Sequence, residues 1–150
     1  MMRASRPDGI DLAARSRARR RALQATYAWQ IARNPMASVM AQFEHEQEMQ
    51  IADLEYFKDL LTGLECNRAE IDLKLRSFLD REVEAVDPIE RAVLRLASYE
   101  LLYRPDVPYR VVINEAIEIA KRFGADFGHT YINGVLDKAA AEWRAAEYRR

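Results

Sequence analysis

The sequence predicts an all-α fold in which the helices pack together as a bundle. Apolar residues recur at helical spacing in almost every segment, and most of the five Gly and five Pro lie at apparent helix ends. The clearest segment is 108–124, whose apolar side chains fall in one arc of about 160° on a helical wheel. An arc that wide needs more than one packing partner, so this segment should be the central helix. The arc consists of Val112, Ile113, Ala116, Ile117, Ile119, Ala120 and Phe123.

The ends of this central helix carry signals of their own. Pro108 can open a helix, Gly124 can adopt the left-handed conformation that stops one, and Lys121 suits the negative C-terminal end. Val111 breaks the pattern, because it is an apolar side chain on the charged face. It therefore stands out as a surface residue that could contact a partner.

Composition is that of an ordinary folded protein. The chain has 150 residues, of which 49% are hydrophobic and 31% charged, and this is enough for one domain with its own core. No apolar run reaches the length of about 18 residues that a membrane span needs, and no apolar signal core begins the chain. We therefore expect a cytoplasmic protein with no membrane partner. Cys66 is the single cysteine, which excludes an internal disulfide.

Charge is distributed unevenly along the chain. Residues 1–33 carry eight arginines against two aspartates, a net charge of +6, so residues 34–150 must carry −7 for the total of −1. A basic end on an acidic body suggests an anionic partner, most simply nucleic acid. Solvated arginines without a partner are the alternative explanation.

The first helix should begin between Asp8 and Asp11 and end before Pro35. Its arginines point in almost every direction around the helix, so the turn that carries them should project rather than pack in a core. These arginines are Arg15, Arg17, Arg19, Arg20 and Arg21. Guanidinium groups on a projecting helix can pair with phosphates bidentately. Tyr27 lies near Arg20 on the wheel and is a candidate for stacking on a base.

Three further helices are expected before residue 83. Pro35 opens a short one, and the next two should span about residues 53–65 and 68–82. Gly63 lies inside the second of these three, where glycine is unfavourable, so it should mark a close crossing of two helices.

The fifth helix has the clearest start in the chain. Residues 87–90 read Asp-Pro-Ile-Glu, which places Asp at the cap, Pro in the first turn and Glu at the third position. Glu100 falls in the middle of the core face, where we expect it to cap backbone N–H groups of the 104–110 connection. Arg91 and Arg95 lie on the opposite face, which we expect to be exposed.

The last helix should start near Asp126 and present two stripes. The second stripe is turned away from the core and consists of Phe127, Tyr131, Gly134 and Lys138. Aromatic rings beside a lysine suit base stacking together with phosphate neutralisation. Packing of this stripe against the amino-terminal helices is the competing interpretation.

No catalytic constellation is found in the sequence. His45 and His129 are the only histidines, so neither a nucleophile–base pair nor a zinc cluster has support. His45-Glu46 resembles the start of a zinc-protease motif, but Met49 occupies the position of its second histidine. No Gly-rich phosphate loop occurs either. We therefore expect no enzyme activity, no cofactor and no metal.

Three blocks together resemble the NusB family of bacterial transcription antitermination factors. They are ARRRALQATYAWQ at 18–30, ERAVLRLASYELLYRPDVPYRVVINEAIEIAKRFG at 90–124 and YINGVLDKAA at 131–140. The segment YFKDLLTGL at 56–64 also fits, so the likeness covers roughly residues 14–140. The resemblance implies an all-α fold of about seven helices in two small packed bundles, in agreement with the helical periodicity.

The resemblance also implies a function and partners. A member of this family is expected to bind the boxA element of nascent ribosomal RNA transcripts as single-stranded RNA, together with NusE, a small-subunit ribosomal protein. It would act in a transcription elongation complex with other Nus factors. On this basis we expect residues 1–13 to form a flexible arm, 14–143 a single NusB-like RNA-binding domain and 144–150 a charged tail.

Position by position, the resemblance implies RNA contacts on the first helix and at the starts of the fifth and last helices. Arg95 and Lys138 are added because they share stripes with these residues. The predicted RNA-binding residues are Arg15, Arg17, Arg19, Arg20, Tyr27, Glu90, Arg91, Arg95, Phe127, Tyr131 and Lys138. Phe127 stands where the family commonly has an acidic residue.

The acidic part of the chain suits a basic ribosomal protein better than RNA. We expect NusE to dock on the polar faces of the carboxy-terminal helices, with Val111, Glu115 and Glu118 as candidate contacts.

Two other functions are compatible with the sequence. Some RNA cytosine-5 methyltransferases carry a NusB-like domain before a catalytic domain, but this chain ends at Arg150, so we expect a free-standing factor. A helical adaptor that binds only proteins would make the arginines incidental. Salt-dependent RNA binding separates the adaptor from the other two.

Overall fold

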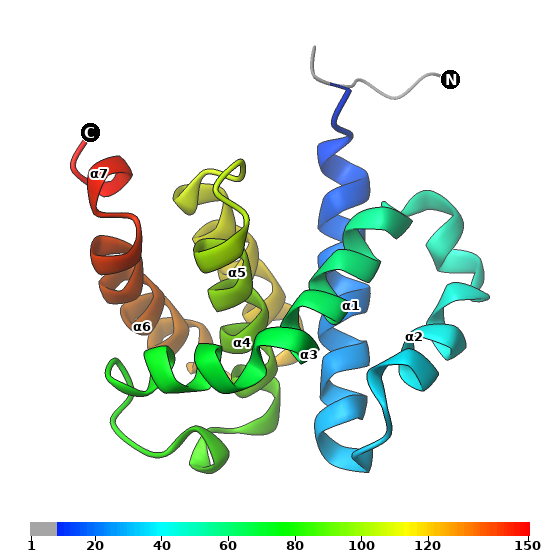
Figure 1. Cartoon of the computed structure of the whole chain (residues 1–150), viewed down its shortest axis with the longest axis horizontal. Helices are drawn as coiled ribbons and strands as arrows, with labels where there is room; N and C mark the ends of the chain where they lie inside the picture. The colour runs from blue at the N-terminus through cyan, green and yellow to red at the C-terminus, as the bar shows by residue number, and fades with distance from the viewer. Residues whose placement is uncertain (1–8) are drawn as a thin grey trace. The chain divides into compact units, whose positions relative to one another are not determined.

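The computed structural model describes residues 9–150, which form seven α-helices and two short 3₁₀ helices, with no strand in that range (Figure 1). The predicted all-α fold is therefore confirmed. The chain divides into two compact units, one up to Thr62 and one from Gly63 to Arg150. Most of the predicted flexible arm, residues 1–13, lies outside the described residues, and Leu12 already belongs to the first helix.

The first unit contains α1 (Leu12–Ala32), α2 (Met36–Glu44), η1 (Gln47–Ile51) and the beginning of α3 (Leu54–Arg76). The predicted bounds of α1 are confirmed, since the Asp11 carboxylate accepts a hydrogen bond from the Ala14 backbone N–H at 3.0 Å and caps the helix. At the other end Arg33 has a φ of 58° and donates its N–H to Trp29. Buried alanines on one face of α1 leave room for α2 and η1, which pack against it.

One helix, α3, replaces the two that we predicted at 53–65 and 68–82. Residues 66–67 do not break the helix. The Asn67 side-chain amide donates a hydrogen bond to the Gly63 carbonyl, one turn earlier in α3, at 2.8 Å. The helix also ends at Arg76 rather than Glu82, so the segment that follows is a loop containing η2 (Val83–Ala85).

The second unit contains α4 (Pro88–Tyr103), α5 (Tyr109–Phe123), α6 (Gly128–Trp143) and α7 (Ala145–Tyr148). The predicted cap of α4 is confirmed, since the Asp87 carboxylate accepts from Ile89 N–H at 3.1 Å and from Glu90 N–H at 3.2 Å. The prediction that α5 has more than one packing partner is confirmed, because it packs against both α4 and α6. Its central position is not, because α4 and α6 also pack against each other, and α4 is the more deeply buried helix, with every residue from Arg91 to Leu101 buried.

Two glycines show how local predictions fared. The predicted close crossing at Gly63 is confirmed, because a Cβ there would overlap the Tyr99 ring of α4. The predicted left-handed stop at Gly124 is wrong, because this residue has a φ of −91° and an extended backbone. Its N–H still closes α5 by donating to the Ala120 carbonyl at 2.8 Å.

The carboxy-terminal residues, which we expected to form a charged tail, include α7 and a buried arginine. The Arg144 guanidinium donates to the carbonyls of Leu101 at 2.7 Å and Val107 at 3.0 Å. It also bonds a Glu147 carboxylate oxygen at 2.7 Å, and the other oxygen of Glu147 accepts from the Tyr109 N–H at 2.8 Å. The α4–α5 connection and the start of α5 are thus tied to α7. Glu100, predicted to hold this connection, is buried, and its capping role stays a prediction.

Candidate nucleic-acid interface

The arginines of α1 are packed against their own unit rather than projecting, so this prediction is wrong. Arg19 is only 5% exposed, and its Nη2 donates to the Tyr56 hydroxyl at 3.4 Å. The Arg15 guanidinium lies 4.2 Å from the centroid of the same ring, a cation–π contact. The aromatic ring at the start of α3 therefore covers part of the basic helix, which a wheel drawn for α1 alone could not reveal.

Acidic and carbonyl groups of the same unit bind further arginines. Arg21 pairs with Glu46 and with Glu48, the latter at 2.9 Å. Arg17 donates to the Ile51 carbonyl at 3.2 Å and is half-buried, as is Arg20. The cationic charge that α1 can present to a ligand is therefore concentrated on fewer groups than the sequence predicts.

Tyr27 is accessible as a stacking group. Its side chain is 39% exposed, and Ile31, one turn further along α1, is exposed as well. The two form a small apolar patch near the half-buried Arg20, on the side of α1 that the helical wheel predicted.

Arg91 and Arg95 were predicted on an exposed stripe, and this is wrong. They are 8% and 3% exposed. Arg95 makes a bidentate contact with the Asp72 carboxylate at 2.9 and 3.0 Å and a further contact with Glu84 at 3.0 Å. Arg91 donates to the Glu84 carbonyl at 3.0 Å and the Val86 carbonyl at 3.3 Å.

The physical reason is the loop between α3 and α4, which folds over this face of α4 and brings Glu84 and Val86 to the arginines. Both arginines hold that loop in place. They therefore position neighbouring residues, and their side chains do not face solvent as an RNA contact would require.

Glu90 lies at the junction of α4 and α6. A Cβ added to Gly128, the first residue of α6, would lie 3.1 Å from the Glu90 carboxyl carbon, so this glycine permits the close approach. Burial raises the pKa of the Glu90 carboxyl, and the nearby Asp87 carboxylate raises it further, while Arg81 opposes both. The half-buried Glu90 thus borders the start of α6, where two predicted RNA-binding aromatics lie.

Phe127 is the more exposed of these two aromatics. It is 82% exposed, the largest value among the exposed large apolar side chains of residues 9–150. A ring this exposed contributes little packing energy to the fold and is available to stack on a planar ligand.

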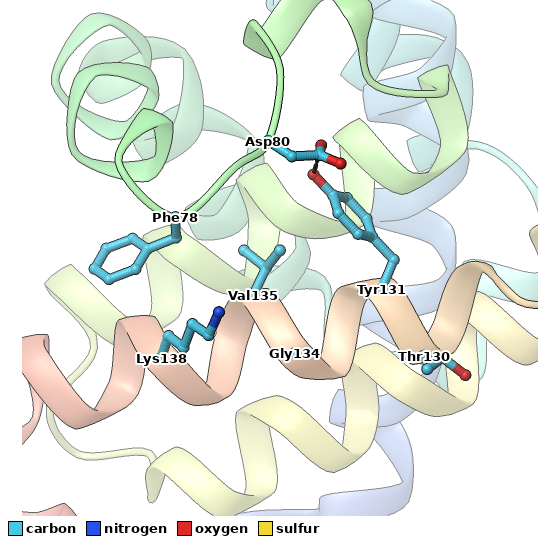
Figure 2. Close-up of a pocket in the computed structure, with 7 residues that line it drawn as sticks. All are labelled: Phe78, Asp80, Thr130, Tyr131, Gly134, Val135 and Lys138. Carbon is cyan, nitrogen blue, oxygen red and sulfur yellow. Dashed lines mark hydrogen bonds between the residues drawn. The ribbon is translucent and has the colours of Figure 1, made fainter.

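Tyr131 opens a pocket of about 300 Å³ on one side of α6 (Figure 2). One wall comes from α6 and the other from the loop after α3. The lining residues include Phe78, Asp80, Tyr131, Gly134, Val135 and Lys138. Three of them belong to the stripe that the sequence predicted to face away from the core, and they are now found together at one hollow.

The loop wall was missed by sequence reasoning. Phe78 falls within the helix predicted over residues 68–82, whereas it lies in the loop, where its ring meets the Trp143 ring edge-on at 5.5 Å and also lines the pocket. Asp80 carried no signal in the sequence, because its position across from α6 depends on where α3 ends.

A hydrogen bond and a cation fix the Tyr131 ring. Its hydroxyl donates to Asp80 Oδ1 at 3.0 Å, and the Arg81 guanidinium lies 5.5 Å from the ring centroid. Arg81 also holds the Asp80 carboxylate through contacts of 2.7 and 3.0 Å. The hydrogen bond from Arg81, followed by that from Tyr131, lowers the pKa of Asp80 to about 2. The pocket therefore has an ionised acceptor at its rim at neutral pH and an exposed cation, Lys138, opposite.

The predicted NusE contacts differ in accessibility. Glu118 is exposed, with its carboxylate 4.0 Å from the Lys121 ammonium, whereas Val111 and Glu115 are half-buried. Val111 is therefore not the fully exposed apolar residue that the wheel suggested. Among residues 9–150, no helix is long and apolar enough to cross a membrane.

Comparisons with known proteins match residues 16–141 to the NusB family. The chain is 67% identical over 145 residues to the transcription antitermination protein NusB of Xanthomonas axonopodis pv. citri (strain 306), covering 97% of this chain and 91% of that protein. It is equally similar, at 67%, to the NusB protein of Xanthomonas oryzae pv. oryzae (strain PXO99A), of which it covers 93%.

Solved structures with the same fold include T. maritima NusB, which is 31% identical with a TM-score of 0.74 over 84% of this chain and 91% of that one. A chain from a crystal structure of the antitermination factors NusB and NusE in complex with dsRNA has a TM-score of 0.77 at 20% identity, over 90% of this chain and 99% of that one. That second likeness concerns the fold alone. The match over residues 16–141 and the high identity over nearly the whole chain establish that this protein belongs to the NusB family.

Proposed function

We propose that this chain is a transcription antitermination factor that binds boxA-type single-stranded RNA of nascent ribosomal RNA transcripts together with NusE. The proposal is supported by relatives at 67% identity that are named transcription antitermination proteins. Its proposed role is binding rather than catalysis, in an elongation complex with other Nus factors.

The observation that carries the proposal is the surface of α6. The exposed Phe127, the half-buried Tyr131 and the exposed Lys138 follow one another along that helix, and the last two line one pocket. Single-stranded RNA presents unstacked bases and a phosphate backbone, so it is bound by aromatic rings that stack on bases beside cations that neutralise phosphates. Glu90 and Arg81 lie close to the same surface.

A second RNA-binding surface is proposed on α1, in the other unit. It comprises the exposed Tyr27 and the partly accessible guanidinium groups of Arg15, Arg17 and Arg20. Arg19, Arg91 and Arg95 are omitted from the proposed contacts because they are buried.

NusE is proposed to dock on the outer face of α5, at Val111, Glu115 and Glu118. Opposite charges on a basic ribosomal protein would speed the association and make it weaken with salt. A joint complex would also bind RNA more tightly than either protein alone, because each contributes part of the contact surface.

The test is a titration of labelled boxA-type RNA, with and without NusE, over a range of salt concentrations. We expect specific binding that NusE strengthens and salt weakens. The logarithm of the affinity should fall by about 0.7 for each phosphate contact per tenfold rise in salt concentration. A scrambled RNA of the same length is the control. Absence of RNA binding with NusE capture intact would support a protein-only adaptor and overturn the proposal.

A further inference from the structure

We infer that Gly134 determines whether a nucleobase can enter the α6 pocket, because the bare backbone at this residue is the surface against which the base lies. The inference rests on the proposed RNA-binding function and deepens it, since it names the part of the RNA that this pocket holds.

Glycine at this position has no explanation in the fold. It lies inside α6, where it destabilises a helix relative to alanine. The glycines at 63 and 128 are required by neighbours, since a Cβ would meet Tyr99 or Glu90, whereas a Cβ at Gly134 would meet no atom within 4 Å. The backbone does not require glycine either, because Gly9 is the only glycine with a positive φ among residues 9–150.

The space that a side chain would occupy at Gly134 belongs to the pocket. Gly134 lines the hollow of about 300 Å³, and Figure 2 shows it on α6 between Tyr131 and Lys138. These three residues are spaced by three and four positions and therefore share one helix face. Phe78 borders the same space from the loop.

The walls match a planar base attached to a phosphate. The Tyr131 ring is held by its hydrogen bond to Asp80 and by Arg81, so little rotational freedom is left to lose when a base stacks on it. Lys138 is exposed at the end of the pocket away from Tyr131 and can reach a phosphate. An apolar side chain of a protein would gain from the rings but would offer no partner to Lys138, whereas a nucleotide supplies both a planar ring and a phosphate.

The first experiment compares Gly134→Ala and Gly134→Leu with the native chain. Both residues suit a helix, and a Cβ at this position meets no atom within 4 Å, so Tm should rise by about 2–4 °C for alanine and should not fall for leucine. The Leu side chain would fill the pocket, so RNA affinity should fall by tenfold or more. Asn133→Leu is the matched control, because Asn133 is an exposed neighbour on α6 that does not line the pocket, and its RNA affinity should be native.

The second experiment replaces each nucleotide of the RNA in turn with an abasic one. Loss of a stacked base weakens binding by about 5- to 150-fold. In the native chain, the nucleotide whose base occupies the pocket should show this loss. In Gly134→Leu the same position should show no further loss, while losses at all other positions stay unchanged.

The outcomes separate this inference from the proposed function. If the native chain binds no boxA-type RNA, the proposed function itself fails. If the native chain binds RNA and a folded Gly134→Leu variant binds it equally well, only the role of Gly134 is overturned. A variant that keeps RNA affinity but loses NusE capture would also overturn it, since the pocket would then hold a protein side chain. If Gly134→Leu does not fold, the abasic series is measured on Gly134→Ala instead. Affinity losses equal to those of the native chain at every position would contradict the inference.

Discussion

At the scale of single residues, Tyr131 combines two roles. Its hydroxyl is hydrogen-bonded to Asp80 across the pocket, while its ring borders the space between α6 and the loop after α3. Because the residue is half-buried, a truncation to alanine would change both stability and binding. A conservative substitution is needed to separate the two.

Tyr131→Phe and Tyr131→Ala should therefore differ. The Phe variant loses one hydrogen bond, so its free energy of unfolding should fall by about 1 kcal/mol or less, and it should keep most of its RNA affinity. The Ala variant also loses the ring and should bind RNA more weakly by about 1–3 kcal/mol. Urea unfolding and RNA titration measure the two effects. Equal RNA affinity for both variants would mean that the ring does not stack on a base.

Asp80 predicts a pH dependence at the acidic extreme. Its pKa is lowered from 3.8 to about 2, so the folded state favours the ionised carboxylate. The resulting stabilisation is fully present above about pH 3.8 and is lost as pH falls through about 2. Asp80→Asn should remove this part of the acid sensitivity and lower the stability near pH 7, because the neutral amide lacks the charge that Arg81 stabilises. Unfolding curves at pH 2–5 for both proteins provide the measurement, and parallel profiles would contradict it.

At the scale of the elements, α1 uses some of its arginines in packing and leaves others partly accessible. Arg19 is buried against Tyr56, and Arg21 is paired with acidic residues of its own unit. Arg17 and Arg20 are half-buried and retain part of their surface for a ligand. The helix can therefore be basic in sequence and only moderately cationic towards RNA.

The α1 arginines should consequently separate in mutagenesis. In an Arg17→Ala, Arg20→Ala double variant, the slope of log RNA affinity against log salt concentration should be shallower by about 1.4 if each arginine contacts one phosphate. Arg19→Ala should instead lower the free energy of unfolding by about 1.5–3 kcal/mol, because it removes a buried hydrogen-bonded charge. RNA titrations at several salt concentrations and chemical unfolding distinguish the two. A salt slope that is unaltered in the double variant would remove α1 from the interface.

The short α7 has an organising role that its length does not suggest. Arg144, just before it, donates to carbonyls in the last turn of α4 and in the α4–α5 connection, and Glu147 within it accepts a hydrogen bond from the first N–H of α5. Charged donors to buried carbonyls are among the stronger hydrogen bonds of a protein. The last residues therefore stabilise the helix that carries the proposed NusE contacts.

At the scale of the whole molecule, charge is shared more evenly between the units than along the chain. Residues up to 62 carry nine basic and eight acidic side chains, and residues from 63 onward carry fourteen and sixteen. The net charges are thus +1 and −2, not +6 and −7, because acidic residues between 44 and 59 fold into the unit that contains α1. Local patches therefore matter more for partner binding than net charge.

The proposed NusE interface can be tested on this basis. A Glu115→Lys, Glu118→Lys double substitution should weaken NusE capture and the joint RNA affinity, because it reverses two charges that would face a basic partner. Glu142→Lys, an equal change per residue at an exposed site on α6, is the control for net charge. Circular dichroism should show unchanged helicity. If capture and joint RNA affinity are both unaffected, the partner docks elsewhere.

The sequence by itself determined the all-α class, the family and the ends of most helices. Caps such as Asp11 and Asp87 act on backbone groups two or three residues away, so their effect can be read without any tertiary information. The stripe that includes Tyr131, Gly134 and Lys138 was also predicted correctly as a face turned from the core, because helical spacing fixes angular position.

Only the tertiary structure decided what covers each helix face. Arg91 and Arg95 were assigned to solvent because a wheel cannot show that α3 and the α3–α4 loop cover them. The same loop brings Phe78 and Asp80 to α6 and turns a flat stripe into a pocket. Packing between segments distant in sequence depends on where each helix stops, and α3 ends at Arg76 without a strong local signal. The pocket was therefore only half visible in the sequence.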